Sequence, residues 1–176
     1  MDHARSQPKA QPKPLDALAL DRLALRYVER FSTTRGKLIT YLAGKIRQRG
    51  WDGAPADPHA LAEKLADLGY IDDRAFAEAR AGAMTRRGLG ARRVAGALRQ
   101  AGVQEEDAKA VMPGVDDQAL QAAMAYARKR RIGPYAAAPA DRVLLEKHIG
   151  ALVRAGHDFG LARRIARLAP GETLEV

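Results

Sequence analysis

Hydrophobic residues recur at three- and four-residue intervals along most of the chain, which is the spacing of one face of an α-helix. Leu20, Leu23, Ala24 and Tyr27 follow this spacing in the first such segment. Most of these segments end at a glycine or proline, residues typical of the positions just beyond a helix. The pattern predicts helices over residues 16–30, 33–49, 58–68, 72–88, 91–101, 104–112, 116–131, 140–155 and 158–169.

Short polar residues and helix breakers predict where some of these helices begin and end. Ser32 and Asp57 are the predicted N-caps of the second and third helices, because their side-chain oxygens can accept from free amide groups. Pro113, followed by Gly114, is predicted to end the sixth helix, since proline lacks an amide proton and clashes with the preceding turn. The segment Arg86–Gly90 is predicted to be a tight turn between two helices.

The predicted helices form three similar groups of three, so the sequence contains an internal repeat. The second helix of each group ends in a related segment, at Ile46–Gly50, Leu98–Gly102 and Leu152–Gly156. The spacings between these endings are 52 and 54 residues. A single three-helix group has a thin core, and stacking neighbours buries what each group leaves open. We therefore predict an all-α fold of three tandem three-helix repeats, stacked into an elongated, curved module.

The ends of the chain differ in composition from the repeats. Residues 1–14 are rich in Pro, Lys and Gln and have almost no apolar side chains, which predicts a disordered arm. The predicted divisions are a disordered N-terminal arm at 1–14, helical repeats at 15–70, 71–113 and 114–170, and a C-terminal tail at 171–176.

The composition favours helices over sheets. Hydrophobic residues make up 47% of the chain and aromatic residues only 5%, so Leu, Ala, Val and Ile must form the core. The absence of cysteine excludes disulfides and thiol catalysis, and it fits a reducing compartment. No apolar run approaches the roughly 20 residues of a membrane span, and the N-terminus lacks the apolar core of a signal peptide. A cytoplasmic location without membrane contact is expected.

No familiar arrangement of catalytic or cofactor-binding residues is present. The four histidines do not have the spacing, with a carboxylate, that a zinc hydrolase needs. His148 is expected within a helix and His157 at a helix N-terminus. The acidic pair Asp72-Asp73 is better explained as a helix N-terminus than as a metal site. We therefore expect no catalytic residue, no cofactor and no metal, and a protein that is not an enzyme.

Positive charge is concentrated in segments without acidic residues. The chain has 30 Lys and Arg against 21 Asp and Glu, a formal charge of +9. Residues 31–51, 79–104 and 118–140 contain no acidic residue but several basic ones, one such stretch per repeat. Unneutralised arginines at a surface are typical of contact with phosphates or with an acidic protein groove. The candidate partner-binding or nucleic-acid-binding residues are Arg86, Arg87, Arg92, Arg93, Arg99, Arg128, Lys129, Arg130 and Arg131.

Two segments of the middle repeat closely resemble the signature of the RecX family of regulatory proteins: Leu68–Ala77, and Arg86–Val94 with its continuation to Leu98 and Gly102. In the first segment we expect Tyr70 and Ile71 to pack at a joint between repeats. Asp72 or Asp73 would cap the next helix and Phe76 would enter its core.

The resemblance implies a non-enzymatic tandem-helix protein that modulates the RecA recombinase in DNA repair, recombination and the SOS response. Such proteins bind the RecA filament, protein plus single-stranded DNA, lie along its groove, and reduce its ATPase and strand-exchange activity. We expect a monomer.

Two alternatives stay open on the residues alone. The chain could bind DNA directly, as a helix-turn-helix-like protein with one helix in a groove, which predicts steep salt dependence on naked duplex. It could instead be an adaptor for acidic proteins, whose binding would survive nuclease treatment.

Overall fold

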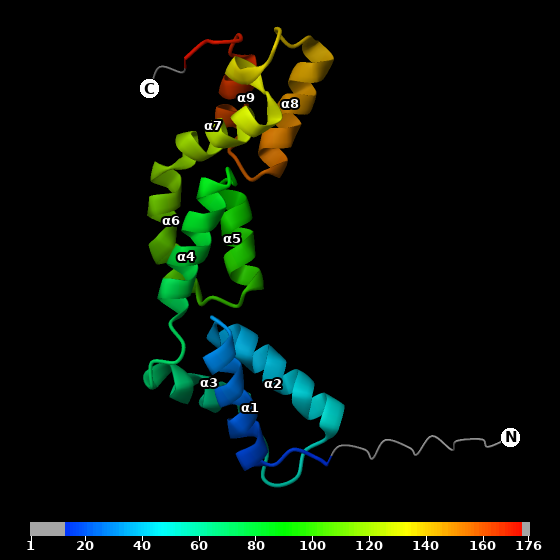
Figure 1. Ribbon diagram of the computed structural model, residues 1–176, viewed down its shortest axis with the longest axis vertical. Helices are drawn as coiled ribbons and strands as arrows, with labels where there is room; N and C mark the ends of the chain where they lie inside the picture. Colours follow the sequence, from blue (N-terminus) through cyan, green and yellow to red (C-terminus); the bar gives the residue numbers. More distant parts are fainter. Residues whose placement is uncertain (1–12, 174–176) are drawn as a thin grey trace, which may run out of the picture. The chain divides into compact units, whose positions relative to one another are not determined.

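The structure is a computed structural model that describes residues 13–173, and its regular elements there are helices (Figure 1). The predicted disordered arm, except for its last two residues, and the end of the predicted C-terminal tail, at 174–176, lie outside the described residues. The chain divides after Ile71 into two compact units. The predicted all-α fold built from helical repeats is confirmed, while the elongated, curved stacking of the repeats stays a prediction.

The first unit is a three-helix bundle made of α1 (Ala17–Arg30), α2 (Arg35–Arg49) and α3 (Pro58–Asp67). Its core is one hydrophobic cluster to which all three helices contribute. Leu15 anchors the start of the bundle: its amide donates to the Gly50 carbonyl at 3.0 Å, and its side chain is fully buried. This pairing holds the entry to α1 against the loop that follows α2.

The start of α2 corrects one expectation. The N-cap is Thr34, not Ser32, and its Oγ1 accepts from the Lys37 amide at 3.1 Å. Thr34 is fully buried, whereas Ser32 is exposed. Both residue types can cap a helix, so the choice depends on which one the bundle encloses. The Asp57 cap of α3 is confirmed, with its carboxylate accepting from the His59 and Ala60 amides.

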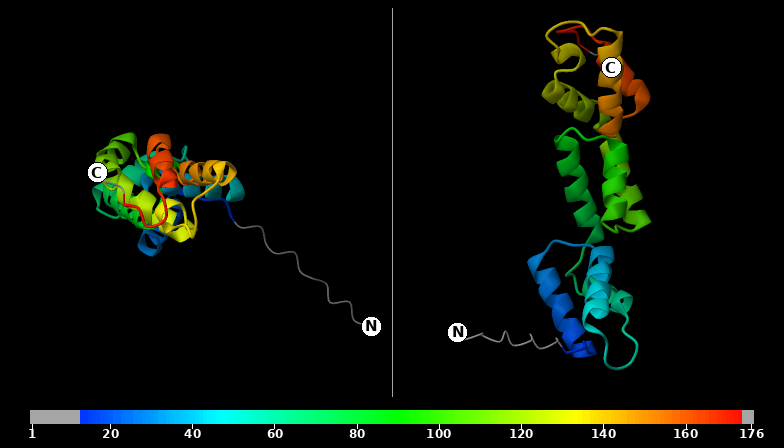
Figure 2. Two further views of the ribbon diagram at one scale, coloured as in Figure 1. Left: turned by 90° about the horizontal axis from the view of Figure 1, so that it is seen from above. Right: turned by 90° about the vertical axis from the view of Figure 1, so that its right-hand side faces the viewer.

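The second unit contains two further bundles. The first comprises α4 (Asp73–Arg86), α5 (Ala91–Gln100) and α6 (Glu105–Asp117), which lie side by side in Figures 1 and 2. The second comprises α7 (Ala119–Arg130), the 3₁₀ turn η1 (Gly133–Tyr135), α8 (Arg142–Arg154) and α9 (Phe159–Arg167). Each bundle has its own hydrophobic cluster, so the three clusters of the described chain follow the three predicted groups of helices.

The predicted end of the sixth helix at Pro113 is wrong, because α6 continues through Pro113 and Gly114 to Asp117. A proline inside a helix costs about 3 kcal/mol. Val111 and Val115, one turn apart on either side of Pro113, are both buried in the core of their bundle. Burial of Val115 offsets part of that cost. Local sequence rules include the cost of the proline but not this burial.

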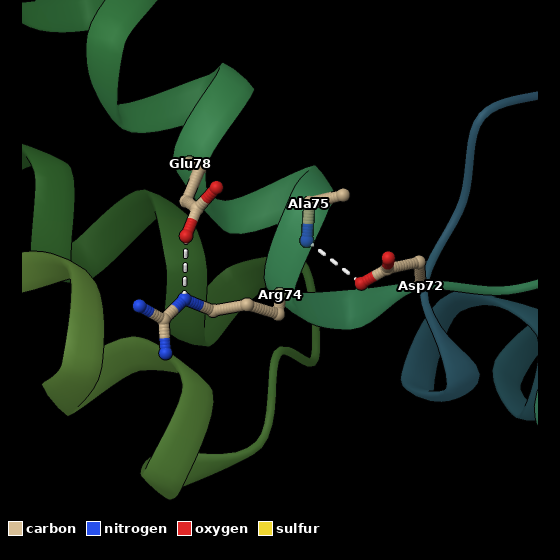
Figure 3. A network of polar contacts seen from close by, with 4 residues as sticks. All are labelled: Asp72, Arg74, Ala75 and Glu78. Atoms are coloured by element: carbon tan, nitrogen blue, oxygen red, sulfur yellow. Dashed lines mark hydrogen bonds and ion pairs between the residues drawn. The ribbon is translucent and has the colours of Figure 1, made fainter.

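The segment that resembles the RecX signature forms the start of α4. The Asp72 carboxylate caps the helix by accepting from the Ala75 amide at 2.8 Å, and Arg74 pairs with Glu78 one turn later at 2.7 Å (Figure 3). Phe76 packs, half-buried, against the core of its bundle, as expected. Ile71 is buried in the cluster of the first unit. Tyr70 is 49% exposed, and its expected packing at a joint between repeats stays a prediction.

Candidate functional site

The candidate basic residues all lie on the second unit and all are exposed. They occupy three places: the end of α4, the length of α5, and the end of α7. On α5, Val94 and Leu98 are buried, whereas Arg92 and Arg99 lie on the opposite, exposed face. The arginines of this helix therefore face solvent while its apolar residues face the core.

The turn between α4 and α5 packs directly on the second bundle of the same unit. The Gly90 amide donates to the Ala155 carbonyl at 2.9 Å, and the Arg92 amide donates to the Gly156 carbonyl at 3.1 Å. A Cβ atom at Gly88 would lie 2.8 Å from the backbone nitrogen of Tyr126. The expected tight turn is confirmed, and its glycines permit a close backbone approach between two bundles.

This approach brings the basic end of α7 to the end of α4. The Lys129 ammonium donates to the Arg87 carbonyl at 3.0 Å. Its positive charge there also interacts favourably with the C-terminal end of the α4 dipole. Arg130 lies over the ring of Tyr126, with 5.8 Å between its guanidinium carbon and the ring centroid. We call the exposed cations around this contact the joint surface: Arg87, Arg92, Arg93, Lys129 and Arg130.

The remaining candidates are exposed, and those beside the joint surface in sequence make contacts of their own. The guanidinium of Arg86 folds back along α4 toward Gly82. Arg99 lies seven residues beyond Arg92, about 10 Å further along α5. Arg128 packs over the ring of Tyr135, at 5.1 Å from the centroid, and Arg131 ends α7 in the left-handed conformation with φ 55°. The structure therefore brings together part of the predicted set, not all of it.

The joint surface lacks carboxylate partners at ion-pair distance within residues 13–173. Ion pairs on exposed sides of the second unit join other residues, namely Arg74–Glu78, Lys109–Glu105 and Arg142–Glu146. Asp158 is an acidic residue whose charge interacts with that of Arg92. Its pKa is lowered by hydrogen bonds from the Leu161, Gly160 and Phe159 amides and by the charge of Arg92. The surface is thus a concentration of positive charge with little local neutralisation.

His157 lies at the centre of the joint between the two bundles. It lies at a helix N-terminus, as predicted: Asp158 caps α9, and His157 directly precedes that cap, almost fully buried. Its Nε2 lies 3.0 Å from the Gly88 carbonyl oxygen, which can only accept, so Nε2 carries the proton. Burial lowers the pKa of His157, and the hydrogen bond to Gly88 opposes this in part. Burial therefore favours the neutral form of the His157 ring in the folded second unit.

We expect the second unit to lose stability as the pH falls below about 6.5, the ordinary pKa of histidine. The folded-state pKa of His157 is depressed, so its contribution is complete above about pH 6.5 and is lost as the pH falls through the folded value. Urea unfolding followed by circular dichroism at pH 7 and pH 5 measures this.

His157→Gln supplies the control, because the amide can donate to Gly88 without titrating. Its urea midpoint should change less between the two pH values than that of the wild type. Equal pH dependence in both proteins would contradict a role for His157. The other charged groups near the ring, Asp158 and Arg92, are retained in both proteins.

A further basic stretch escaped the sequence analysis. Residues 159–171 also contain no acidic residue, and the same criterion would have found them. In the structure Arg163 and Arg167 of α9, with Arg142 of α8, border an apolar groove of about 710 Å³ between the two helices.

Two further features concern residues 13–173. No helix in this part of the chain is both long and apolar enough to cross a membrane. No group of three or more His, Asp or Glu side chains there is arranged to hold a metal ion.

Known proteins similar to this chain agree on one family. Residues 72–112 match the family model described as RecX, second three-helix domain. The chain is 32% identical to the regulatory protein RecX of Myxococcus xanthus over 94% of its own length and 97% of that protein. It is 29% identical to the regulatory protein RecX of Agrobacterium fabrum, over 87% of this chain and 84% of that one.

A solved structure shows the same fold. The crystal structure of RecX from Lactobacillus salivarius superposes with a TM-score of 0.60 and 18% identity, covering 83% of this chain and 91% of that one. The RecX proteins similar in sequence cover most of the chain, and a solved RecX structure has the same fold. The chain therefore belongs to the RecX family of regulatory proteins.

Proposed function

We propose that this chain binds the RecA–DNA filament and reduces its ATPase and strand-exchange activity, with the joint surface as a contact region. Membership in the RecX family supports a regulatory role. The observation that carries the proposal is the joint surface itself, where cations from the ends of α4 and α7 and from α5 lie exposed, with no paired carboxylate among residues 13–173. A cytoplasmic location and a monomeric state belong to the same proposal.

Charge complementarity is the physical basis of this contact. Arg87, Arg92 and Arg130 come from different helices, yet the contact between the two bundles holds them in one region. Guanidinium groups pair with phosphates and carboxylates in two-pronged geometry, and they release bound counterions when they meet a polyanion. A nucleoprotein filament presents both phosphates and acidic side chains. A partner of this kind can supply the negative charge that the chain does not provide locally.

Direct duplex binding by α5 would depend on its side chains. In helix-turn-helix proteins the N-terminal residues of the recognition helix contact the bases, and the side chains of Arg92 and Arg93 are exposed at this end. Here the backbone at the N-terminal end of α5 is covered, because the Gly90 and Arg92 amides bond to the second bundle of the unit. Phosphate or base contact by these amides would require the two bundles to separate.

The proposal is tested by adding the full chain to RecA assembled on single-stranded DNA and measuring ATP hydrolysis. Hydrolysis should fall when the chain is substoichiometric to RecA, since one molecule on a filament affects several protomers. Co-sedimentation should show stronger binding to the filament than to free RecA or free DNA. Unchanged hydrolysis would overturn the proposal. Steep salt dependence on naked duplex, without filament preference, would favour the helix-turn-helix alternative.

A further inference from the structure

Three aromatic rings gather on one side of the first unit, where α1 ends beside α2. The rings of Tyr27 and Tyr41 are stacked, with centroids 4.3 Å apart and an interplanar angle of 22°. Phe31 follows Tyr27 one turn later, with ring centroids 5.3 Å apart. We call these three residues the aromatic platform. They account for a large share of the aromatic residues of a chain that has only 5% of them.

Tyr27 and Tyr41 are partly buried and pack against the core of the first unit, so Phe31 is the exposed ring of the aromatic platform. Phe31 is 49% exposed, whereas the fully buried core of the same bundle is aliphatic. Its backbone is fixed, because it forms the C-cap of α1 and its amide donates to the Tyr27 carbonyl at 3.0 Å. A rigid, half-exposed aromatic ring costs solvation free energy in the isolated protein, and a ligand with a flat apolar face would relieve that cost.

Positive charge surrounds the aromatic platform. The guanidinium of Arg30 lies 5.5 Å from the Phe31 ring centroid, and the ammonium of Lys45 lies 5.5 Å from that of Tyr41. Lys37 and Lys45 are one turn before and one turn after Tyr41, on the same side of α2. The nearest acidic residue in sequence, Glu29, lies two residues from both Tyr27 and Phe31 and so faces the other side of α1.

An exposed aromatic ring among cations is a feature with which proteins bind single-stranded nucleic acids. Bases stack on aromatic side chains whatever their sequence, while lysines and arginines contact the phosphates. An acidic peptide would use the cations but not the flat ring face. A duplex would not offer its base faces, because they are stacked inside the helix. The combination on this surface therefore fits single strands better than either of these ligands.

We propose that the aromatic platform is a single-stranded nucleic-acid site, with Phe31 as the exposed stacking residue and Arg30, Lys37 and Lys45 as the phosphate-contacting cations. The site belongs to the first unit and shares no residue with the joint surface. It does not depend on the proposed action on RecA, because naked single strands are its ligand.

The test compares binding of the full chain to fluorescently labelled oligo(dT) and to an abasic oligonucleotide of the same length. Both probes carry the same phosphates, but only oligo(dT) carries bases. In fluorescence anisotropy titrations Phe31→Leu should weaken oligo(dT) binding about five-fold or more, the lower end of what one base–ring stack contributes. The same substitution should leave abasic binding unchanged. A parallel oligo(U) titration distinguishes a preference for RNA from one for DNA.

Two matched variants complete the design. Phe31→Tyr keeps a ring and should retain oligo(dT) affinity within two-fold (about 0.4 kcal/mol). Phe159→Leu removes the other strongly exposed phenylalanine, 55% exposed on the second unit, and should have no effect. The proposal is overturned if Phe31→Leu leaves oligo(dT) binding unchanged, or if it weakens both probes equally. RecA is absent from this experiment, so its failure would leave the proposed function untouched.

Discussion

Gly90→Ala is expected to destabilise the second unit by about 2–4 kcal/mol, a combination of overpacking and lost hydrogen bonds. Gly90 has φ −85°, an ordinary backbone conformation, so the effect is purely steric. A Cβ atom there would overlap the carbonyl carbon and oxygen of Gly156 and lie 2.6 Å from the His157 amide nitrogen. These are backbone atoms, which cannot rotate away, so the two bundles must move apart.

Separation of the bundles breaks specific contacts. The hydrogen bonds from the Gly90 and Arg92 amides to Ala155 and Gly156 would lengthen, and His157 would lose its Gly88 partner. Urea unfolding monitored by circular dichroism measures the change in unfolding free energy. A second, earlier transition would show that the bundles separate before they unfold.

Gly96→Ala is the matched control for this experiment. Gly96 lies in the middle of the same short helix, α5, and a Cβ atom there has only a distant contact, 4.0 Å from the end of the Arg99 side chain. Alanine in a helix interior is favoured over glycine by about 0.5–1 kcal/mol, so this variant should be slightly more stable than wild type. Equal effects of the two substitutions would contradict the close approach at Gly90.

Removing three charges from the joint surface should raise the concentration needed for RecA inhibition by about ten-fold or more. The variant carries Arg87→Ala, Arg92→Ala and Arg130→Ala, one substitution from each region that meets at the joint. Exposed charge pairs contribute up to about 1 kcal/mol each, and about 1.4 kcal/mol corresponds to a ten-fold change in affinity. The ATPase assay described above, repeated at increasing concentrations of the variant, measures the shift.

The control removes the same net charge from paired cations. Arg74→Ala, Lys109→Ala and Arg142→Ala eliminate three exposed positive charges that already have a carboxylate one turn away. If the absence of local neutralisation matters, this variant should inhibit RecA nearly as well as wild type. Equal loss of inhibition in both variants would show that only net charge counts. Circular dichroism should confirm that both variants remain folded.

The helices of this protein could be predicted from sequence because the information is local. The three- and four-residue spacing of Leu and Ala, with glycine after most helices, placed every described helix except α6 and α7 to within about two residues at both ends. The basic, acid-free stretches were also visible, because adjacency along the chain is itself a sequence property. The resemblance to the RecX family was also visible in short contiguous segments, those around Asp72 and Gly88.

Errors arose where packing decided between locally acceptable options. Thr34 rather than Ser32 caps α2 because the bundle encloses it, and α6 passes Pro113 because Val115 is buried beyond it. The grouping of Tyr27, Phe31 and Tyr41 also depends on packing. The predicted core-facing position of Tyr27 is confirmed, since Tyr27 packs, partly buried, against the core of its bundle. Only the structure shows that its ring meets those of Tyr41 and of the exposed Phe31, with cations beside them.

The sequence by itself determined the helical class, the three-fold repetition and the chemical character of the exposed side chains. Only the tertiary structure decided which of these side chains act together. Arg87 and Lys129 are 42 residues apart, and they meet because glycines at 88, 90 and 156 let two backbones approach. Periodicity describes which face of a helix is buried, whereas the partner of that face depends on contacts between distant segments that no local pattern encodes.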